Sequence, residues 1–403
     1  MKLYDPSYSV VSLFCGLGGL DLGFSWEGFN LIWANDISSN AVKSHQRNFG
    51  TPAICADITN YPLKNIPDAD VIIGGPPCQS FSLLGQRNFN DPRGRLVFRF
   101  LDIIKAKRPK AFVMENVPGM AASMVGRVRL TDHLMASFSE LGYTTAKFNL
   151  LASDFLVPQR RRRIILVGIL GGNPTMISGE AFSKLCYGRN PLDSDISAMA
   201  AIGDLGSCTG KGDRALYLNK RPSRFAALMR SAGLPDVSLH ELPRMSQTDR
   251  LLVRHIPPGG NYTDIPDDLS TGRILKFKES GGRTTTYGRL HHDRPAYTIN
   301  TYFRRPNVGC NFHYCEERLI TPREAMRFQS IPDHFEVVFS SQDERNALIG
   351  NAVPPLLARA LAISVKSSLN MADAEPQPRA LFKVLNKAVP SKRKLLASTG
   401  SSH

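Results

Sequence analysis

The first 170 residues predict an α/β fold built on a doubly wound, mostly parallel sheet, and the sequence after them predicts a second, smaller domain. Short β-rich apolar runs alternate with longer helical patterns over the first stretch, which is typical of βαβ units. After Gly171 the sequence becomes irregular and rich in Gly, Ser, Pro and Arg until about Thr321, a stretch too long for a loop. With 403 residues, 42% of them hydrophobic, the chain can bury such a core, and disorder is excluded for its bulk.

The individual elements follow from the periodicity of the apolar residues. Apolar runs predict strands at Ser9–Phe14, Leu31–Asn35, Asp70–Ile73, Ala111–Met114 and Arg163–Gly168. An amphipathic pattern predicts a helix at Leu96–Lys107, and helical periodicity returns at Arg318–Gln329 and at Asp343–Val365. The tail from Asn370 to His403 combines Pro, Ser and a basic cluster, so we expect it to be mobile.

The charge balance favours a polyanionic partner. Lys and Arg number 50 and Asp and Glu 35, a formal net charge of +15, which favours nucleic acid because each phosphate neutralised by a basic side chain releases counterions. A generically basic protein is the alternative. The seven cysteines form no paired framework, which indicates free thiols in a reducing cytosol. No secretory signal or membrane-spanning run is evident, so we expect a cytoplasmic protein without a membrane partner.

A glycine-rich turn follows the first predicted strand. Gly16–Gly19 comes soon after Phe14, and Asp36 ends the next strand about 20 residues further on. Glycines let the backbone approach a ligand, and a carboxylate at this spacing accepts hydrogen bonds from ribose hydroxyls, so the pattern indicates a nucleoside site. Asp21 stands where a dinucleotide fingerprint needs glycine and would repel a pyrophosphate, which favours an adenosine cofactor without phosphates. A purely structural turn is the alternative.

Two further turns follow strands of the same sheet. Gly74–Ser82 can continue as neither helix nor strand, so it holds Cys78 at the carboxyl end of a parallel strand, where open α/β sheets place their active sites. A thiolate attacks better than an alcohol near neutral pH, which makes Cys78 a candidate nucleophile. The next strand delivers Glu115 to the same edge, where a partly desolvated acid can donate a proton or a hydrogen bond. The alternatives are a small apolar cysteine packed under the loop and a carboxylate at a helix start.

A run of arginines leads into the last predicted strand of the first domain. Strand alternation places Arg161 and Arg163 on one face and Arg160 and Arg162 on the other, so one pair is expected to face the cleft and the other solvent or phosphate. A solvated edge is the usual alternative for a charge run, but the strand that follows is apolar and central.

Two later motifs are less informative. Gly350–Pro355 indicates only a turn followed by a helix start. Cys310, His313 and Cys315 have the residue types of a zinc site, but their spacing lacks a second paired set. We therefore expect no metal there, and place these residues in the strand and turn that precede the Arg318 helix.

Taken together and in chain order, these segments resemble the DNA (cytosine-5) methyltransferase family. The matching segments are Phe14–Gly19, Pro77–Gln79, Glu115–Val117, Gln159–Arg163, Arg318–Gln329 and Gly350–Val353. The resemblance implies a bacterial enzyme of the restriction-modification type, with the S-adenosylmethionine methyltransferase fold, that binds S-adenosylmethionine and holds double-stranded DNA between its two domains. We expect a monomer that acts on the same site as a cognate restriction endonuclease.

The resemblance also implies the domain boundaries. Residues 1–170 would form the catalytic and cofactor-binding domain and residues 171–335 the target-recognition domain. The helices at 336–368 would return to the catalytic domain, and 369–403 would be a basic tail.

The resemblance assigns roles to residues at matching positions. Cys78 would attack C6 of a flipped-out cytosine, which turns C5 into a nucleophile for the methyl group. Glu115 would hydrogen-bond N3 and the exocyclic amine, Arg163 would bind O2, and Arg161 would support the Cys78 loop. The implied cofactor-binding residues are Phe14, Gly16, Leu17, Gly18, Gly19, Asp36, Ile37, Asp57, Ile58, Pro77, Leu96 and Asn351. DNA contacts are expected from a closing loop, at Gln79, Ser82, Arg87 and Arg93.

Three alternative functions stay open at this point. The same motifs would serve an RNA cytosine methyltransferase, although the long recognition region, with basic stretches suited to groove reading, favours DNA. A catalytically silent DNA-binding relative is disfavoured because Cys78 and Glu115 are both present. A nicotinamide-dependent dehydrogenase is disfavoured by Asp21.

Overall fold

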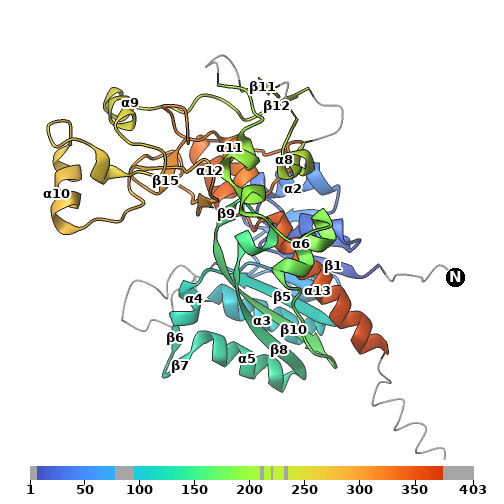
Figure 1. The fold of residues 1–403 in the computed structure, drawn as a ribbon. Helices are drawn as coiled ribbons and strands as arrows, with labels where there is room; N and C mark the ends of the chain where they lie inside the picture. Colours follow the sequence, from blue (N-terminus) through green and yellow to red (C-terminus); the bar gives the residue numbers. More distant parts are fainter. Residues whose placement is uncertain (1–6, 78–94, 209–212, 219–220, 231–234, 375–403) are drawn as a thin grey trace, which may run out of the picture.

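The computed structural model describes residues 7–77, 95–208, 213–218, 221–230 and 235–374, and their fold is organised around a seven-stranded sheet (Figure 1). The strand order is β3-β2-β1-β4-β5-β10-β8. The strands are β1 (Ser9–Leu13), β2 (Asn30–Asp36), β3 (Ala53–Cys55), β4 (Val71–Gly74), β5 (Ala111–Asn116), β8 (Tyr143–Leu151) and β10 (Arg162–Leu170). The first five pair in parallel, and β10 runs antiparallel to both β5 and β8. The mostly parallel α/β sheet predicted from the sequence is confirmed.

The five predicted strands are all present, whereas the two edge strands have no counterpart among the predictions. β3 has only three residues, and most side chains of β8 are exposed or half-buried. Edge strands need less apolar sequence because part of their surface meets solvent. The central strands β5 and β10 are buried along almost their whole length, which is why their apolar runs identify them.

Helices cover both faces of the sheet, as a doubly wound topology requires. The helices are α1 (Gly19–Trp26) and α13 (Pro355–Ala374) on one face, and α3 (Arg95–Lys107) and α5 (Leu130–Glu140) on the other. Each strand packs against the helices on both faces of the sheet, because consecutive side chains point to opposite faces. In β4, for example, Val71 and Ile73 pack in the α1 and α13 layer, and Ile72 packs in the α3 and α5 layer.

The C-terminal helix α13 packs on the sheet although it follows residues 171–335 in the chain. A Cβ atom on Gly23 of α1 would overlap Ala358 of α13, so the two helices are in close contact. The helix continues to Ala374, with Leu369 and Ala372 buried. The helix therefore runs past residue 369, where the tail was expected to start, because its buried apolar residues continue to pack against the rest of the fold. Residues 375–403 lie outside the described residues.

The stretch Gln342–Asp373 is the one helical segment of the described chain that is long and apolar enough to span a membrane by length and composition. Of its apolar window, 78% is buried inside the molecule. Packing against the sheet therefore accounts for its apolar sequence.

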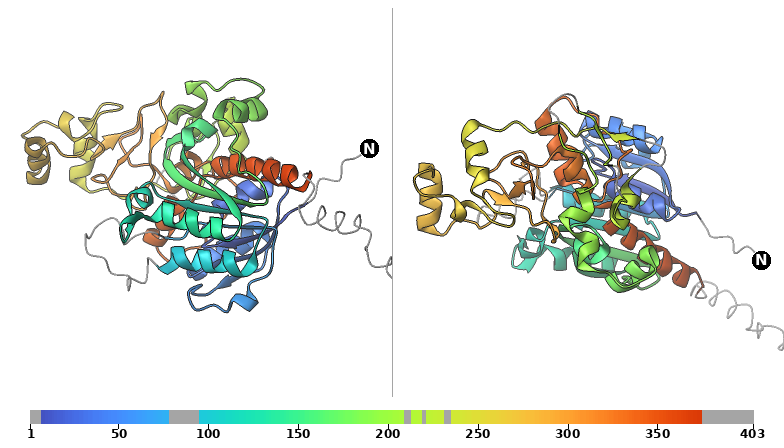
Figure 2. Two further views of the ribbon diagram at one scale, coloured as in Figure 1. Left: turned by 90° about the horizontal axis from the view of Figure 1, so that it is seen from below. Right: turned by 45° about the horizontal axis from the view of Figure 1, so that its top comes forward.

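Residues 171–335 fold into short elements to one side of the sheet (Figure 1, Figure 2). The helices are α6 (Gly179–Tyr187), α7 (Ala198–Ile202), α8 (Arg224–Met229), α9 (Gln247–Arg254), α10 (Gly272–Ser280) and α11 (Pro322–Phe328). Two-stranded pairs are formed by β11 (Ala215–Leu216) with β12 (Asp236–Val237) and by β13 (Gly288–Arg289) with β15 (Cys310–Phe312). α9 and α10 enclose a small apolar core that includes Leu252, Ile274 and Phe312, and they project away from the sheet.

Smaller elements complete the fold. They are α2 (Ser39–Phe49), α4 (Gly119–Ala122), β6 (Met124–Val125), β7 (Val128–Arg129), β9 (Gln159–Arg160), β14 (Ala296–Tyr297) and α12 (Gln342–Asn351). Single 3-10 turns lie at Leu63–Asn65, Ala152–Phe155, Asp193–Ile196 and Tyr262–Asp264. β9 pairs in parallel with β14, which joins the chain before β10 to the later part of the irregular region.

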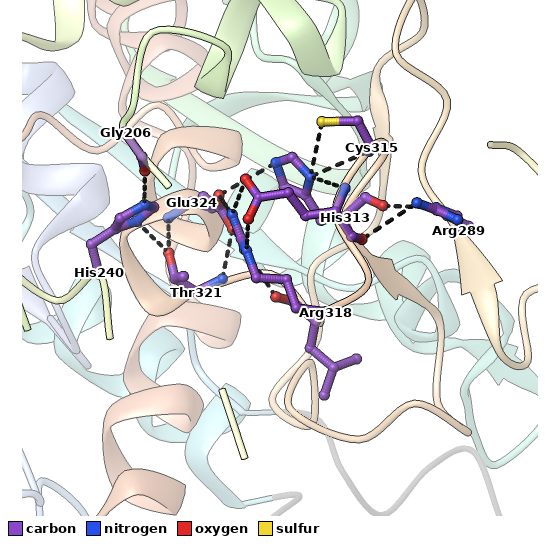
Figure 3. Close-up of polar contacts among 10 residues, drawn as sticks. Gly206, His240, Arg289, His313, Cys315, Arg318, Thr321 and Glu324 are labelled. Carbon is purple, nitrogen blue, oxygen red and sulfur yellow. Dashed lines mark hydrogen bonds and ion pairs between the residues drawn. The ribbon is translucent and has the colours of Figure 1, made fainter. Parts of the chain in front are cut away.

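A buried polar network holds the start of α11 (Figure 3). The Thr321 hydroxyl accepts the N–H of Glu324 at 3.1 Å, and Glu324 Oε2 accepts the N–H of Thr321 at 2.8 Å. Arg318 donates two hydrogen bonds of 2.8 Å to the Glu324 carboxylate, and His240 Nδ1 lies 2.9 Å from Thr321 Oγ1. This reciprocal cap starts the helix at Pro322, later than the periodicity from Arg318 predicts.

Cys310, His313 and Cys315 do not converge on a metal position. His313 Nδ1 accepts the backbone N–H groups of Cys315 at 3.3 Å and Glu316 at 3.1 Å, and its Nε2 lies 3.6 Å from Glu324. Cys310 packs under Gly288 of the neighbouring strand. Within the part of the chain that the structure describes, no three His, Cys, Asp or Glu side chains are grouped for metal binding.

Candidate functional site

A cavity of about 590 Å³ lies at the carboxyl ends of β1, β2, β4 and β5. Open α/β sheets bind their ligands at this edge. Eleven of the predicted cofactor-binding residues line it: Phe14, Gly16, Leu17, Gly19, Asp36, Ile37, Asp57, Ile58, Pro77, Leu96 and Asn351. Glu115 and Arg163 line it as well, so the fold brings two predicted catalytic residues into the same space as the predicted cofactor residues.

The turn after β1 presents backbone to the cavity. Phe14, Gly16 and Gly18 have positive φ angles of 54°, 52° and 83°, so the chain turns sharply before α1 begins at Gly19. A Cβ atom on Gly19 would overlap the carbonyl oxygen of Val353 in the cavity wall. Gly18 is the exception among the predicted cofactor residues. It does not line the cavity, and a Cβ there would lie 2.5 Å from the Phe49 ring, so conformation and packing explain this glycine.

Asp36 ends β2 with both carboxylate oxygens held by backbone. Its Oδ2 accepts the N–H of Gly16 at 2.8 Å, and its Oδ1 accepts the N–H of Ser38 at 2.9 Å. Burial raises the pKa of this carboxyl, and the backbone hydrogen bonds oppose that effect. Because each oxygen has a second lone pair, Asp36 can accept further hydrogen bonds from a ligand.

Glu115 and Arg163 form an ion pair in the cavity wall. Arg163 Nε lies 2.5 Å from Glu115 Oε1, and about a tenth of each side chain is exposed. Arg163 also donates to the carbonyl oxygen of Arg162 at 2.7 Å. The pair presents an acceptor and a cation side by side, which suits recognition of neighbouring polar atoms on one planar ligand.

Asn116 links this wall to the turn after β4. Its Nδ2 donates to the carbonyl oxygen of Pro76, and its Oδ1 accepts the N–H of Val117, each at 2.9 Å. Pro76 and Pro77 have no N–H, so this turn cannot continue the hydrogen bonding of the strands. The Asn116 side chain anchors the turn instead. Cys78 follows this turn, but it lies outside the described residues, as do the other predicted loop residues Gln79, Ser82, Arg87 and Arg93.

Arg161 is fully buried and does not line the cavity. Its Nη1 donates to the carbonyl oxygen of Ile299 and its Nη2 to that of Gly350, each at 2.9 Å, while Nε has no hydrogen-bond partner among the described residues. Burial lowers the pKa of this guanidinium well below its usual value. Arg161 therefore ties the chain before β10 to α12, at the residue preceding Asn351 of the cavity wall.

The cavity wall is acidic although the chain as a whole is basic. Its carboxylates are Asp21, Asp36, Asp57, Glu115 and Glu344. Among the described lining residues Arg163 is the one basic side chain, and it is paired with Glu115. Such a wall favours a cationic ligand over one that carries phosphates.

On the α12 side of the cavity the sequence predicted Asn351 but missed the lining residues of the helix before it. Glu344, Leu348 and Asn351 lie on one face of this helix at helical spacing and all line the cavity. Glu344 accepts hydrogen bonds from Asn40 Nδ2 at 2.8 Å and from the N–H of Ser340 at 2.9 Å, so it also joins α12 to α2. Once Asn351 was assigned, helical periodicity could have identified Glu344 and Leu348.

The chain is similar over most of its length to proteins of one family. The family described as C-5 cytosine-specific DNA methylase matches residues 8–367. The Type II methyltransferase M.NgoFVII of Neisseria gonorrhoeae is 33% identical over 359 residues, which cover 88% of this chain and 86% of the relative. The Type II methyltransferase M.XorII of Xanthomonas oryzae is 33% identical over 386 residues, which cover 91% of this chain and 86% of the relative.

Solved structures share the fold. A prophage-encoded protein of E. coli, described as a DNA modification methyltransferase, matches with a TM-score of 0.65 at 23% identity and covers 90% of this chain and 100% of its own. The Dnmt2 methyltransferase of S. pombe matches with a TM-score of 0.57 at 15% identity and covers 90% of this chain and 99% of its own. At these identities the likeness establishes the methyltransferase fold alone.

Proposed function

Because this chain belongs to the C-5 cytosine-specific DNA methylase family, we propose that it transfers the methyl group of S-adenosylmethionine to C5 of a cytosine turned out of a specific duplex DNA sequence. The transfer proceeds through a temporary bond between Cys78 and C6. One observation carries this proposal: a single cavity contains Asp36, Glu115 and Pro77. Since Pro77 immediately precedes Cys78, a cofactor site adjoins a site for the reacting base.

The residues of the cavity fit S-adenosylmethionine, which supplies a methyl group on a positively charged sulfur. Asp36 can accept hydrogen bonds from the ribose hydroxyls. Asp57 and Ile58 line the same cavity and are assigned to contacts with the adenine. A Cβ at Gly16 would meet nothing within 4 Å, so the space above this turn is open to a ligand. The acidic wall suits a cation and opposes the pyrophosphate of a dinucleotide.

The chemistry at the cytosine follows from the groups around its ring. When the Cys78 thiolate bonds to C6, the electrons of the C5–C6 double bond become available at C5, which then bonds to the methyl group as the sulfur–methyl bond breaks and leaves a neutral thioether. Glu115 donates its acid proton to N3 and accepts from the exocyclic amine, and Arg163 donates to O2, so both stabilise the negative charge that develops on the ring, and N3 returns the proton when the thiolate leaves. A base then removes the C5 proton, the double bond re-forms and the thiolate leaves.

DNA binding uses the rest of the chain. A cytosine inside a stacked duplex does not expose C6, so it must leave the helix, and the net charge of +15 favours the contacts with phosphates that offset this cost. We assign catalysis to residues 1–170 with the helices of 336–368, and target recognition to residues 171–335. Gln79, Ser82, Arg87 and Arg93 are assigned to contacts with the target strand.

A domain exchange tests the recognition assignment. Replacing residues 172–283 by the matching region of another family member is expected to change the methylated sequence, as read by bisulfite mapping. Unchanged specificity would contradict the assignment.

The relatives named above are Type II methyltransferases. We therefore place this enzyme in a bacterial cytoplasm, as a monomer that modifies the site cut by a cognate restriction endonuclease. Bisulfite mapping of DNA from cells that express the chain would identify the site, and the modified DNA should resist cleavage there.

The decisive experiment replaces the nucleophile. Cys78→Ser is expected to reduce transfer of tritiated methyl groups to DNA to background, while the affinities for cofactor and DNA stay within about twofold. The wild-type protein should become covalently trapped on a duplex that contains 5-fluorocytosine, and the variant should not. Cys315→Ser, at an exposed cysteine, is the matched control and should keep full activity. Substantial turnover by Cys78→Ser would refute the covalent role, and transfer to RNA instead of DNA would refute the substrate.

A further inference from the structure

Asp21, in the first turn of α1, is fully buried and has one oxygen without a partner. Its Oδ1 lies 3.0 Å from Nε2 of His45 on α2, and neither side chain is exposed. Asp21 Oδ2 and His45 Nδ1 have no hydrogen-bond partner among the described residues. Asp21 nevertheless belongs to the cavity wall.

An unpaired oxygen on a buried carboxylate is costly, because the group loses its hydration without replacement. His45 does not remove this cost. A neutral His45 imidazole donates its Nε2–H to Asp21 Oδ1 and leaves the charge of Asp21 in place. A protonated imidazole would also carry a buried N–H at Nδ1, which has no acceptor among the described residues. The N-terminus of α1 attracts a carboxylate, but this effect is smaller than that of a direct counter-charge. The site therefore favours a cation in the adjoining cavity.

No basic side chain of the described wall neutralises Asp21. Arg163 is the one basic lining residue there, and it is paired with Glu115. The charge of Asp21 does act at the wall: burial raises the pKa of the neighbouring Cys15 thiol, and Asp21 and Asp36 raise it further. Cys15 lines the cavity, so the field of Asp21 extends to the space where a ligand binds.

The position of Asp21 indicates which end of the cofactor would lie near it. Asp36 ends β2 and Asp57 follows β3, whereas Asp21 follows the Gly16–Gly19 turn. An S-adenosylmethionine with its ribose at Asp36 and its adenine at Asp57 would extend its methionine portion toward that turn. This portion carries both of the positive charges of the cofactor, the ammonium and the sulfonium.

We propose that Asp21 is the counter-charge for a cation on the methionine end of the cofactor, either the ammonium or the sulfonium. This inference rests on the proposed function. Asp21 has no exposed surface, so it acts without touching the cofactor, through its field across the Gly16–Gly19 turn. Charges interact more strongly there than in water because the protein interior has a lower dielectric constant.

The test removes the charge and keeps the shape. Asp21→Asn retains an oxygen that accepts from His45, and calorimetric titration compares its affinities with those of wild type. The ligands are S-adenosylmethionine, S-adenosylhomocysteine, which lacks the sulfonium, and 5′-methylthioadenosine, which lacks both cations. We expect the affinity for S-adenosylmethionine to fall about tenfold and that for 5′-methylthioadenosine to stay within about twofold. An equal loss for S-adenosylhomocysteine assigns the ammonium, and a retained affinity assigns the sulfonium.

Matched variants separate charge from structure. Glu27→Gln removes the same charge from the other end of α1, where Glu27 pairs with Arg359 at 2.6 Å outside the cavity, and should change none of the three affinities. His45→Gln keeps the charge of Asp21 and should keep the affinity for S-adenosylmethionine. If thermal unfolding shows that Asp21→Asn does not fold, Asp21→Ser removes the charge without an amide to accommodate.

Two results would overturn the inference alone: an unchanged affinity for S-adenosylmethionine, or an equal loss for all three ligands. A wild-type protein that binds none of the ligands would refute the proposed cofactor, and the inference about Asp21 with it.

Discussion

Arg163 on β10 holds the carboxylate of Glu115 on β5 at 2.5 Å, and the two strands are antiparallel neighbours in the sheet. Glu115 is opposite Ile165 in the strand register, so Arg163 reaches it diagonally from two residues earlier in β10. Strand pairing, and no loop, sets this geometry. The side of the cavity that we propose binds the base is therefore preorganised by the sheet.

Replacing the acid of this pair tests its role in the reaction. Glu115→Gln keeps an oxygen that accepts from Arg163 but removes the negative charge that holds Arg163 and the acid that we propose donates to N3 during attack. We expect kcat to fall about 10²–10³-fold, the loss typical for one preorganised transition-state group, with cofactor affinity unchanged. Glu180→Gln, in an exposed pair with Lys184, is the control and should leave kcat unchanged. A kcat within twofold of wild type for Glu115→Gln would remove Glu115 from the catalytic assignment.

Cofactor affinity should depend on pH through Asp36. Burial raises the pKa of this carboxyl above its ordinary value, so it takes up a proton at a higher pH than a free aspartate as the solution is acidified. The protonated group loses one acceptor for the ribose, and affinity falls. The apo protein shows the opposite sign from this group: the folded state binds the proton more tightly than the unfolded state, so this contribution stabilises the fold as the pH falls through the raised pKa.

Titration calorimetry across the acidic range checks this dependence. The affinity of wild type for S-adenosylmethionine should fall on acidification, at a higher pH than the ordinary pKa of a carboxyl would give. Asp36→Asn should bind weakly at every pH without that step. An unchanged step in Asp36→Asn would assign the titration to another carboxylate of the wall.

The sequence predicted the parts of the fold and of the site that depend on residues close together in the chain. The parallel strands appear as apolar runs because both of their faces are buried, and the carboxyl ends of these strands supply Asp36 and Glu115. The edge strand β8 was missed because its exposed face carries polar residues. Gly18 and Gly19 are indistinguishable in a glycine-rich turn, yet one packs against Phe49 and the other faces the cavity.

Long-range contacts could not be predicted in this way. Arg161 was expected to support the Cys78 loop, which lies outside the described residues, and the structure gives it two further partners, the carbonyl oxygens of Ile299 and Gly350. No sequence pattern near Arg161 encodes these partners, because they depend on how distant segments pack. The same holds for Asp21, whose partner His45 lies on another helix.

The two hydrogen bonds that Arg161 donates to Ile299 and Gly350 should affect cofactor binding, although Arg161 does not line the cavity. Arg161→Lys keeps the charge, but a single ammonium cannot reproduce the planar fork that bonds Ile299 and Gly350 together. We expect the melting temperature to fall by several degrees, as a loss of about 1–3 kcal/mol would cause, and the KM for S-adenosylmethionine to rise because Gly350 precedes Asn351. A lower kcat with unchanged KM and melting temperature would instead place Arg161 at the reacting base.

The close approach of Gly19 to Val353, which lies between α12 and α13, predicts a strict requirement for glycine. Gly19→Ala would place its methyl group on the carbonyl oxygen of Val353, and backbone at the junction of two helices cannot move aside as a flexible side chain can. We expect a loss of about 1–3 kcal/mol in the free energy of unfolding, seen as a melting temperature several degrees lower, together with weaker cofactor binding. Gly272→Ala is the control, because a Cβ there meets nothing within 4 Å and the residue begins α10 with ordinary backbone angles. That variant should be as stable as wild type or more so by up to about 1 kcal/mol. Equal stability of the two variants would mean that the junction of Gly19 with Val353 relaxes at no cost, and the cavity wall would then be less rigid than this packing requires.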